Sequence, residues 1–454
     1  MGDENISKQG WGQLSAGIDL PFHADLRIPE LTEIRLAIPS PDPVRDVIGT
    51  TRRAVIEKLA GDVTRGMTIA VGGGSRGLTQ RVDLLRGTIE GLRELGAEPF
   101  VVPAMGSHGG GTAEGQIDML ASLGMTEESV GAEIRATMET VEVARTPSGM
   151  PIYLDRFAAA ADRILPVNRM KPHTCFKGPI ESGCTKMAVV GFGKQPGAAQ
   201  IHSCGPIESG CTKMAVVGFG KQPGAAQIHS CGPTEMRERL LEGIEALRVT
   251  GRLLGGVASV ESASGDVVSV NALTSAQVGG DEERRLTEMA RDLVPLLPFS
   301  DIDVLIIERG GKDISGTTID PNVTGRFWVH GLAETDQLRV ATIVLLGITE
   351  VSAGNVLGIG LADFIPVSVA EQIDWQKTYL NCFTAGPSGV RRSRMPMVLR
   401  DEESCLKAAL SMCGRGVTEP KRVVRIRSTL HMTSCWVSDE LLKTLPEGAQ
   451  VVVK

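Results

Sequence analysis

Two histidines in this sequence have the surroundings expected for acid–base chemistry. The chain contains seven histidines; His108 lies in the glycine-rich stretch 105–111, and His173 follows Lys171-Pro172. An imidazole titrates near neutral pH, so two of them facing one carbon atom from opposite sides could handle a proton on either face. The ordinary alternative for each is a surface or structural histidine.

Two loops carry basic residues among glycines, where an anion could bind. Arg76 lies in the loop 72–77, and Lys312 lies in the 19-residue stretch 308–326. Glycine lets backbone N–H groups approach a phosphate, and arginine adds a bidentate contact. The first loop has no GxGxxG spacing, so the sequence lacks a dinucleotide-binding fingerprint. The alternatives are a tight strand-to-helix turn and an irregular surface loop, although long loops are more often functional than idle.

A perfect repeat contains a further pair of candidate residues. Residues 178–204 recur without any change as residues 205–231. The first copy holds Lys186 and His202, and the second holds Lys213 and His229 in the same places. An activated lysine can anchor a group covalently, and a neutral histidine is a common ligand for nickel. Because one folded site cannot use both copies, we expect one copy to be an exposed insertion.

Alternating strands and helices are expected to position these residues. A helical pattern of leucines and isoleucine at 84–95 lies between the first two of three predicted strands, which are 67–71, 99–103 and 163–167. This order predicts parallel pairing and an α/β fold. The loops with Arg76, His108 and His173 each follow one of these strands. Ligands bind at the carboxyl ends of such strands, so the three side chains are expected to converge on one crevice.

A second α/β region begins near Phe299 with a buried-type strand at 302–307. A charged helical pattern at 281–294 and two prolines precede it, which indicates a boundary near residue 297. We therefore predict two α/β domains with a cleft between them. The N-terminal domain, with a Rossmann-like parallel sheet and the repeat, spans 1–296, and a smaller C-terminal domain spans 297–454.

The composition excludes several classes of protein. The 454 residues are 42% hydrophobic and 22% charged, as in soluble globular proteins. A formal net charge of -7 without a basic stripe argues against a nucleic-acid partner. The sequence has no long apolar stretch free of charge, so we expect no membrane span or membrane partner. Nine scattered cysteines without a CxxC pair favour free thiols and a cytoplasmic location.

The ordered set of candidate residues resembles the nickel-dependent lactate racemase family over roughly residues 20–430. The set comprises Arg76, His108, the Lys171-Pro172-His173 turn, Lys186, His202 and the loop of Lys312. The phrases KPHTCFKGPIESG and GKDISGTTIDPNVTGR indicate a divergent branch of this family. The resemblance implies an isomerase, a racemase or epimerase, that inverts C2 of a small-molecule 2-hydroxy acid.

The resemblance also implies a cofactor and residue roles. The cofactor would be the nickel-pincer nucleotide, pyridinium-3,5-bisthiocarboxylic acid mononucleotide nickel, attached to Lys186 through a thioamide and delivered by cofactor-biosynthesis enzymes. His202 would bind the nickel. His108 and His173 would be the acid–base pair, while hydride moves between C2 and the cofactor. Arg76 and Lys312 would bind the substrate carboxylate or the cofactor phosphate.

We expect the first copy of the repeat to supply the working lysine and histidine. Lys186 follows His173 by 13 residues, close to the gap in the family, whereas Lys213 follows it by 40. The alternative is the second copy, because it runs directly into a predicted helix at 233–247.

Two other classes of function stay open. The first is a conventional nucleotide-dependent oxidoreductase, which the missing fingerprint disfavours. The second is a non-catalytic carboxylate-binding homologue, which the retained histidine pair disfavours.

Overall fold

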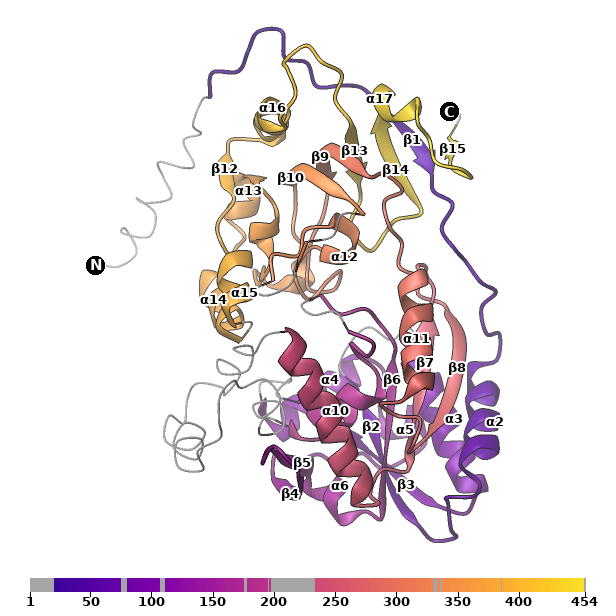
Figure 1. The fold of residues 1–454 in the computed structure, drawn as a ribbon. Helices are drawn as coiled ribbons and strands as arrows, with labels where there is room; N and C mark the ends of the chain where they lie inside the picture. Colours follow the sequence, from indigo (N-terminus) through magenta and orange to yellow (C-terminus); the bar gives the residue numbers. More distant parts are fainter. Residues whose placement is uncertain are drawn as a thin grey trace, which may run out of the picture. The chain divides into compact units, whose positions relative to one another are not determined.

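The computed structural model divides the chain into two units (Figure 1). It describes residues 20–74, 80–106, 111–174, 178–194, 196, 233–329, 333–334, 337–384 and 386–452. The N-terminal unit consists of residues 40–293 with a short piece at 384–386, and the C-terminal unit holds the other described residues. The division after Leu293 lies near the predicted boundary at residue 297, whereas residues 20–39 belong to the C-terminal unit.

The N-terminal unit is built on a five-stranded sheet of order β3-β2-β6-β7-β8. The first four of these strands run parallel, and β8 is antiparallel to β7. A separate antiparallel hairpin is formed by β4 and β5. The strands are β2 (Thr68–Gly73), β3 (Glu98–Pro103), β4 (Thr140–Arg145), β5 (Pro151–Asp155), β6 (Arg163–Arg169), β7 (Gly255–Glu261) and β8 (Val267–Thr274).

Helices cover both faces of this sheet. Ile69 and Val71 of β2 pack in one hydrophobic cluster with α2 and α3, while Ala70 between them packs in another with α10 and α11. Alternate residues of a strand point to opposite faces, so burial on both sides produces the continuous apolar runs seen in the sequence. The helices are α2 (Val47–Leu59), α3 (Arg81–Glu94), α4 (Ala113–Ser122), α5 (Glu127–Val130), α6 (Arg156–Ala160), α7 (Cys184–Lys186), α10 (Pro233–Val249) and α11 (Asp281–Asp292).

The C-terminal unit contains an eight-stranded mixed sheet of order β12-β11-β10-β9-β13-β14-β1-β15. The strands from β12 to β13 run parallel, whereas β14 is antiparallel to β13 and β1 is antiparallel to both its neighbours. The strands are β1 (Leu31–Arg35), β9 (Asp301–Ile307), β10 (Arg339–Leu345), β11 (Phe364–Pro366), β12 (Met397–Leu399), β13 (Val423–Ile426), β14 (Ser434–Ser438) and β15 (Gln450–Val451).

Strand β9 shows how this sheet is buried. Leu305 and Ile307 belong to one core cluster, and Val304 and Ile306 belong to the cluster on the opposite face. The helices around the sheet are α12 (Pro321–Thr324), α13 (Val367–Ala370), α14 (Trp375–Thr384), α15 (Gly386–Arg392), α16 (Glu402–Met412) and α17 (Asp439–Leu442). The predicted fold class of two α/β domains is therefore confirmed.

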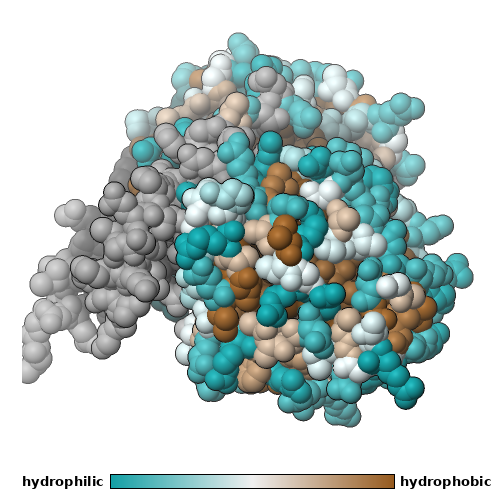
Figure 2. All heavy atoms as spheres, turned by 60° about the horizontal axis from the view of Figure 1, so that its bottom comes forward, coloured by the Kyte–Doolittle hydropathy of each residue, from teal (hydrophilic) through white to brown (hydrophobic). Residues whose placement is uncertain are grey.

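None of the described helices combines the length and the apolar composition needed to cross a bilayer. Figure 2 shows one face of the molecule, where hydrophobic residues lie in separate patches among hydrophilic ones. Scattered apolar side chains of this kind are normal on folded proteins.

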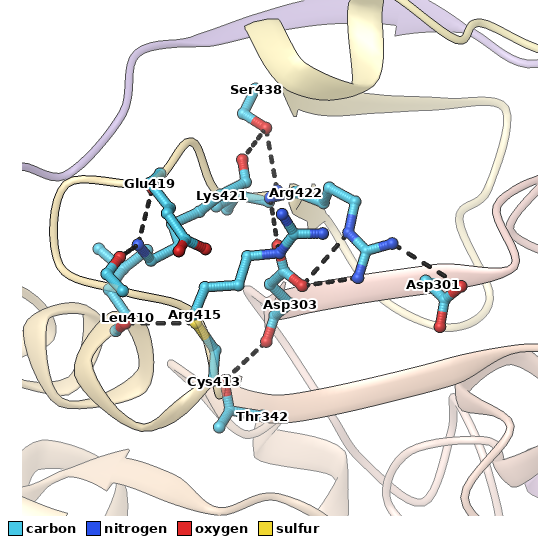
Figure 3. A network of polar contacts seen from close by, with 12 residues as sticks. Asp301, Asp303, Thr342, Leu410, Cys413, Arg415, Glu419, Lys421, Arg422 and Ser438 are labelled. Atoms are coloured by element: carbon cyan, nitrogen blue, oxygen red, sulfur yellow. Dashed lines mark hydrogen bonds and ion pairs between the residues drawn. The ribbon is translucent and has the colours of Figure 1, made fainter.

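A buried carboxylate fastens the loop before β13 to the start of β9 (Figure 3). Asp303 accepts hydrogen bonds from the Arg422 guanidinium at 2.8 Å and from the Arg422 backbone N–H at 2.7 Å. The Nε atom of Arg415 lies 2.7 Å from the same carboxylate. Burial by itself would raise the pKa of Asp303, but the hydrogen bonds from Arg422 and Arg415 outweigh it and hold this pKa below its ordinary value.

We expect Asp303→Asn to lower the free energy of unfolding at pH 7 by about 2–4 kcal/mol, because both guanidinium groups lose their carboxylate. The folded-state pKa lies below the unfolded-state pKa, so this stabilisation is present above the unfolded-state pKa and is lost as the pH falls through the folded-state pKa. In urea titrations, the difference between variant and parent should therefore shrink at acid pH.

The neighbouring Asp301 offers a matched control for this experiment. Its carboxylate meets Arg339 at 2.8 Å and lies farther, 3.7 Å, from Arg422, and the Arg339 side chain is 72% exposed. Exposed ion pairs contribute little, so Asp301→Asn should cost less than about 1 kcal/mol. Equal losses for the two variants would contradict the role given to Asp303.

Candidate active site

The carboxyl edge of the N-terminal sheet brings together the ends of β2, β3 and β6. Gly73 of β2 is paired with Pro103 of β3, and Gly72 is paired with Pro166 of β6. The three chain segments that leave these strands therefore start side by side, as the sequence predicted. The loops 75–79 and 107–110 lie outside the described residues, and with them the predicted site residues Arg76 and His108.

His173 and Lys186 meet at this edge. His173 lies four residues beyond the end of β6, and Lys186 is the last residue of α7. Their Nε2 and Nζ atoms are 2.8 Å apart, and both residues are half-buried. At this distance the two side chains form a hydrogen bond, so the imidazole orients the amine of Lys186. Two of the residues singled out in the sequence are thus in direct contact.

Glu181, which lies in the first copy of the repeat, fixes the backbone at His173. Its buried carboxylate accepts the backbone N–H of His173 at 2.7 Å and that of Gly178 at 3.1 Å. The guanidinium of Arg291, on α11, contacts the same carboxylate at 2.7 Å. A carboxylate that bridges two backbone donors and an arginine fixes the backbone of His173, whose imidazole lies beside the lysine.

A second buried carboxylate fixes the helix that carries Lys186. Glu283, also on α11, accepts the backbone N–H of Thr185 at 2.9 Å and its hydroxyl at 2.5 Å, together with the backbone N–H of Gly279 at 2.7 Å. Burial raises the pKa of Glu283, and the hydrogen bonds from Thr185 and Gly279 oppose this effect. The residue before the lysine is therefore locked to a neighbouring helix.

The segment after Lys186 is pressed against the end of β3. Residues Met187–Gly191 form a π-helical turn, a geometry frequent at functional sites. A Cβ atom on Gly191 would lie 2.5 Å from the carbonyl oxygen of Ala104, so only glycine permits this approach. Met187 and Phe192 are buried in the core of the unit. The first copy of the repeat is thus a structural part of the N-terminal unit as far as residue 194.

Lys312 belongs to the C-terminal unit, in the loop that follows β9. Its backbone N–H donates to the hydroxyl of Ser352 at 2.8 Å, and its ammonium group donates to the carbonyl of Gly316 at 2.7 Å. The loop is held by its own contacts and by the short 3-10 turn Glu350–Ser352. The structure describes Lys312 within this unit alone.

Several predicted residues lie outside the described part of the chain. These are Arg76, His108 and His202, together with Lys213 and His229 of the second copy. Their proposed roles stay predictions. Conversely, sequence reasoning missed Glu181 and Glu283, the two carboxylates that hold the His173–Lys186 pair. Glu181 had one available signal, its place in the phrase KPHTCFKGPIESG, whereas Glu283 is an ordinary member of a charged helix.

These features define a class: a two-unit α/β protein with a lysine–histidine pair at the carboxyl edge of a parallel sheet. The fold is that of lactate racemase. The structure of the lactate racemase apoprotein from Thermoanaerobacterium thermosaccharolyticum matches with a TM-score of 0.50, at 14% sequence identity, over 88% of this chain and 99% of that chain. A crystal structure of a Thermotoga maritima protein matches with a TM-score of 0.43, at 14% identity, over 68% of this chain and 72% of that chain.

Comparisons by sequence add nothing to the match in fold. No protein-family model matches the chain, and no curated protein matches it. The resemblance to lactate racemase inferred from the ordered residues is therefore confirmed at the level of the fold.

Proposed function

We propose that this chain is a divergent member of the lactate racemase family and inverts C2 of a 2-hydroxy acid. The observation that carries the proposal is the 2.8 Å contact between Lys186 and His173 at the carboxyl edge of the sheet. These are the residues that, by resemblance, anchor the cofactor and handle the substrate proton. They come together within a fold that matches a lactate racemase apoprotein.

The surroundings of Lys186 fit a covalently attached nickel-pincer nucleotide. Lys186 is half-buried, its helix is fixed by Glu283, and the imidazole of His173 lies 2.8 Å from its amine. His202 would be the protein ligand to nickel, and Arg76 would bind a carboxylate or phosphate. When bound, the nucleotide supplies a hydride acceptor that returns the hydride to either face of C2.

The histidines supply the remaining chemistry. His173 and His108 would take and return the proton of the substrate hydroxyl, and C2 would pass through a planar 2-keto acid. Because this carbon is planar, it can be reduced to either configuration. Lys312 would add a positive charge for the substrate carboxylate or the cofactor phosphate. We place this activity in the cytoplasm with the cofactor-biosynthesis enzymes as partners, and the five described cysteines, all free and buried, suit a reducing compartment.

The experiment uses the full chain, produced with and without the cofactor-biosynthesis enzymes. Each acid in a panel of 2-hydroxy acids is incubated with the protein, and chiral chromatography measures the two enantiomers. We expect only the loaded protein to interconvert the enantiomers of one or more of these acids. Substrate deuterated at C2 should keep its deuterium, because a hydride that leaves and returns does not exchange with water. Activity that instead needs a soluble nicotinamide nucleotide and accumulates a 2-keto acid would identify an oxidoreductase and overturn the proposal.

A further inference from the structure

A fully buried lysine lies in the first copy of the repeat, outside the chemistry described so far. Lys194 follows the π-helical turn and has a left-handed backbone, with φ of 50°. Its ammonium group donates to the carbonyl of Pro103 at 2.5 Å and to Oε1 of Gln116 at 2.8 Å. It also lies 3.1 Å from Oδ2 of Asp155, and both side chains of this ion pair are 0% exposed. Such a charge is tolerated inside a protein only when it is paired and hydrogen-bonded.

Gln116 extends this cluster to the segment before the loop 107–110. Its Nε2 atom donates to the carbonyl of Gly106 at 2.8 Å, and Gln116 itself lies in the first turn of α4, which follows the loop. The backbone N–H of Gly106 donates to the carbonyl of Gly191 at 3.1 Å. The segment that carries Lys186 therefore contacts Gly106, which precedes the loop 107–110, and Gln116 of α4, which follows it.

Asp155 ties the same segment to the helix α6. Its Oδ1 atom accepts the backbone N–H groups of Phe157 at 2.8 Å and Ala158 at 3.2 Å, as the N-cap of α6. Its own backbone N–H donates to the carbonyl of Phe192 at 2.7 Å. Burial raises the pKa of Asp155 and lowers the pKa of Lys194, and the ion pair opposes both shifts. The cluster thus joins four separate pieces of chain at one point.

We infer that Lys194 is a positioning residue, which holds the segment of Lys186, the end of β3 and the first turn of α4 in one arrangement. This inference rests on the proposed function, in which the loop supplies the acid–base residue His108. Lys194 acts indirectly, because its amine is enclosed by protein atoms and its hydrogen bonds go to Pro103 and Gln116, which lie on either side of the loop 107–110 in the sequence. A displacement of about 1 Å at a reacting group can cost on the order of a hundredfold in rate.

The repeat provides a matched control. Lys221 has the same sequence on both sides in the second copy as Lys194 has in the first. Lys194→Met and Lys221→Met therefore make the same chemical change in the same local sequence. Because a lone Asp155 left buried could unfold the protein, a double variant, Lys194→Met with Asp155→Asn, removes both charges at once. A third variant, Gln116→Met, has a similar volume and cuts only the link through Gln116.

The first readout needs no cofactor. In the protein without cofactor, amide hydrogen exchange of peptides covering residues 103–112 should be at least about tenfold faster in the double variant and in Gln116→Met than in the parent. Lys221→Met should match the parent. Unchanged exchange in the first two variants, or an equal change in Lys221→Met, would overturn the inference.

The second readout separates positioning from general stability. In loaded protein, kcat should fall about tenfold to a hundredfold in the double variant and in Gln116→Met, while KM and the adduct on Lys186 stay unchanged. An unchanged kcat despite faster exchange would overturn the positioning role. A parent that acts on no 2-hydroxy acid would instead sink the proposed function, and the exchange experiment would still decide whether Lys194 holds the loop.

Discussion

Replacing Lys186 by arginine should abolish covalent loading of the cofactor, while the same replacement at Lys213 should leave loading intact. Arginine keeps the positive charge but cannot form the thioamide. The expectation follows from the position of Lys186, which is held by Glu283 through Thr185 and lies 2.8 Å from His173. Intact-mass spectrometry of protein produced with the cofactor-biosynthesis enzymes measures the loss of the adduct.

Tryptic peptides identify which copy carries the adduct. Cleavage after Lys177, Lys194 and Lys221 leaves a modified Lys186 in the peptide 178–194 and a modified Lys213 in the longer peptide 195–221. The two masses differ although the sites have the same flanking sequence. An adduct found in the longer peptide would assign the anchor to the second copy. Persistence of the adduct in the Lys186→Arg variant would have the same meaning.

Replacing His173 by alanine should lower the rate of racemisation about 100-fold or more, the usual loss when an acid–base group is removed. The adduct on Lys186 should remain, because the lysine and not the imidazole forms the covalent bond. His23→Ala is the control: this histidine is exposed, with 58% of its side chain accessible. Added imidazole should restore part of the activity of the His173→Ala variant, and a variant with the parent rate would exclude His173 from the reaction.

The positions of the strands could be predicted because each signal is local. The strands predicted at 67–71, 99–103 and 163–167 are β2, β3 and β6. They pair in parallel, as expected for strands that are joined by a helix or another long crossover and not by a tight turn. His173 was singled out from a signal of the same kind, a polar turn after a buried strand, and its catalytic role stays a prediction.

The supports of the site could not be predicted, because they depend on contacts between distant parts of the chain. Glu283 lies 98 residues from Thr185, and Lys194 lies 78 residues from Gln116. In the sequence, Glu283 belongs to a charged helix and Lys194 belongs to a glycine-rich turn. Glutamate and lysine side chains at such positions are usually exposed to solvent. Only the folded chain buries them, and burial makes their pairing necessary.

The location of β1 has a consequence for synthesis on the ribosome. This strand is made before the N-terminal unit, yet it lies between β14 and β15, which are translated after that unit. Roughly 400 residues separate Leu31 from Ser438, so at about 5–20 residues per second β1 waits on the order of 20–80 s for its partners. The N-terminal unit can form during this delay, whereas the sheet of the C-terminal unit is completed only once β14 and β15 have been made.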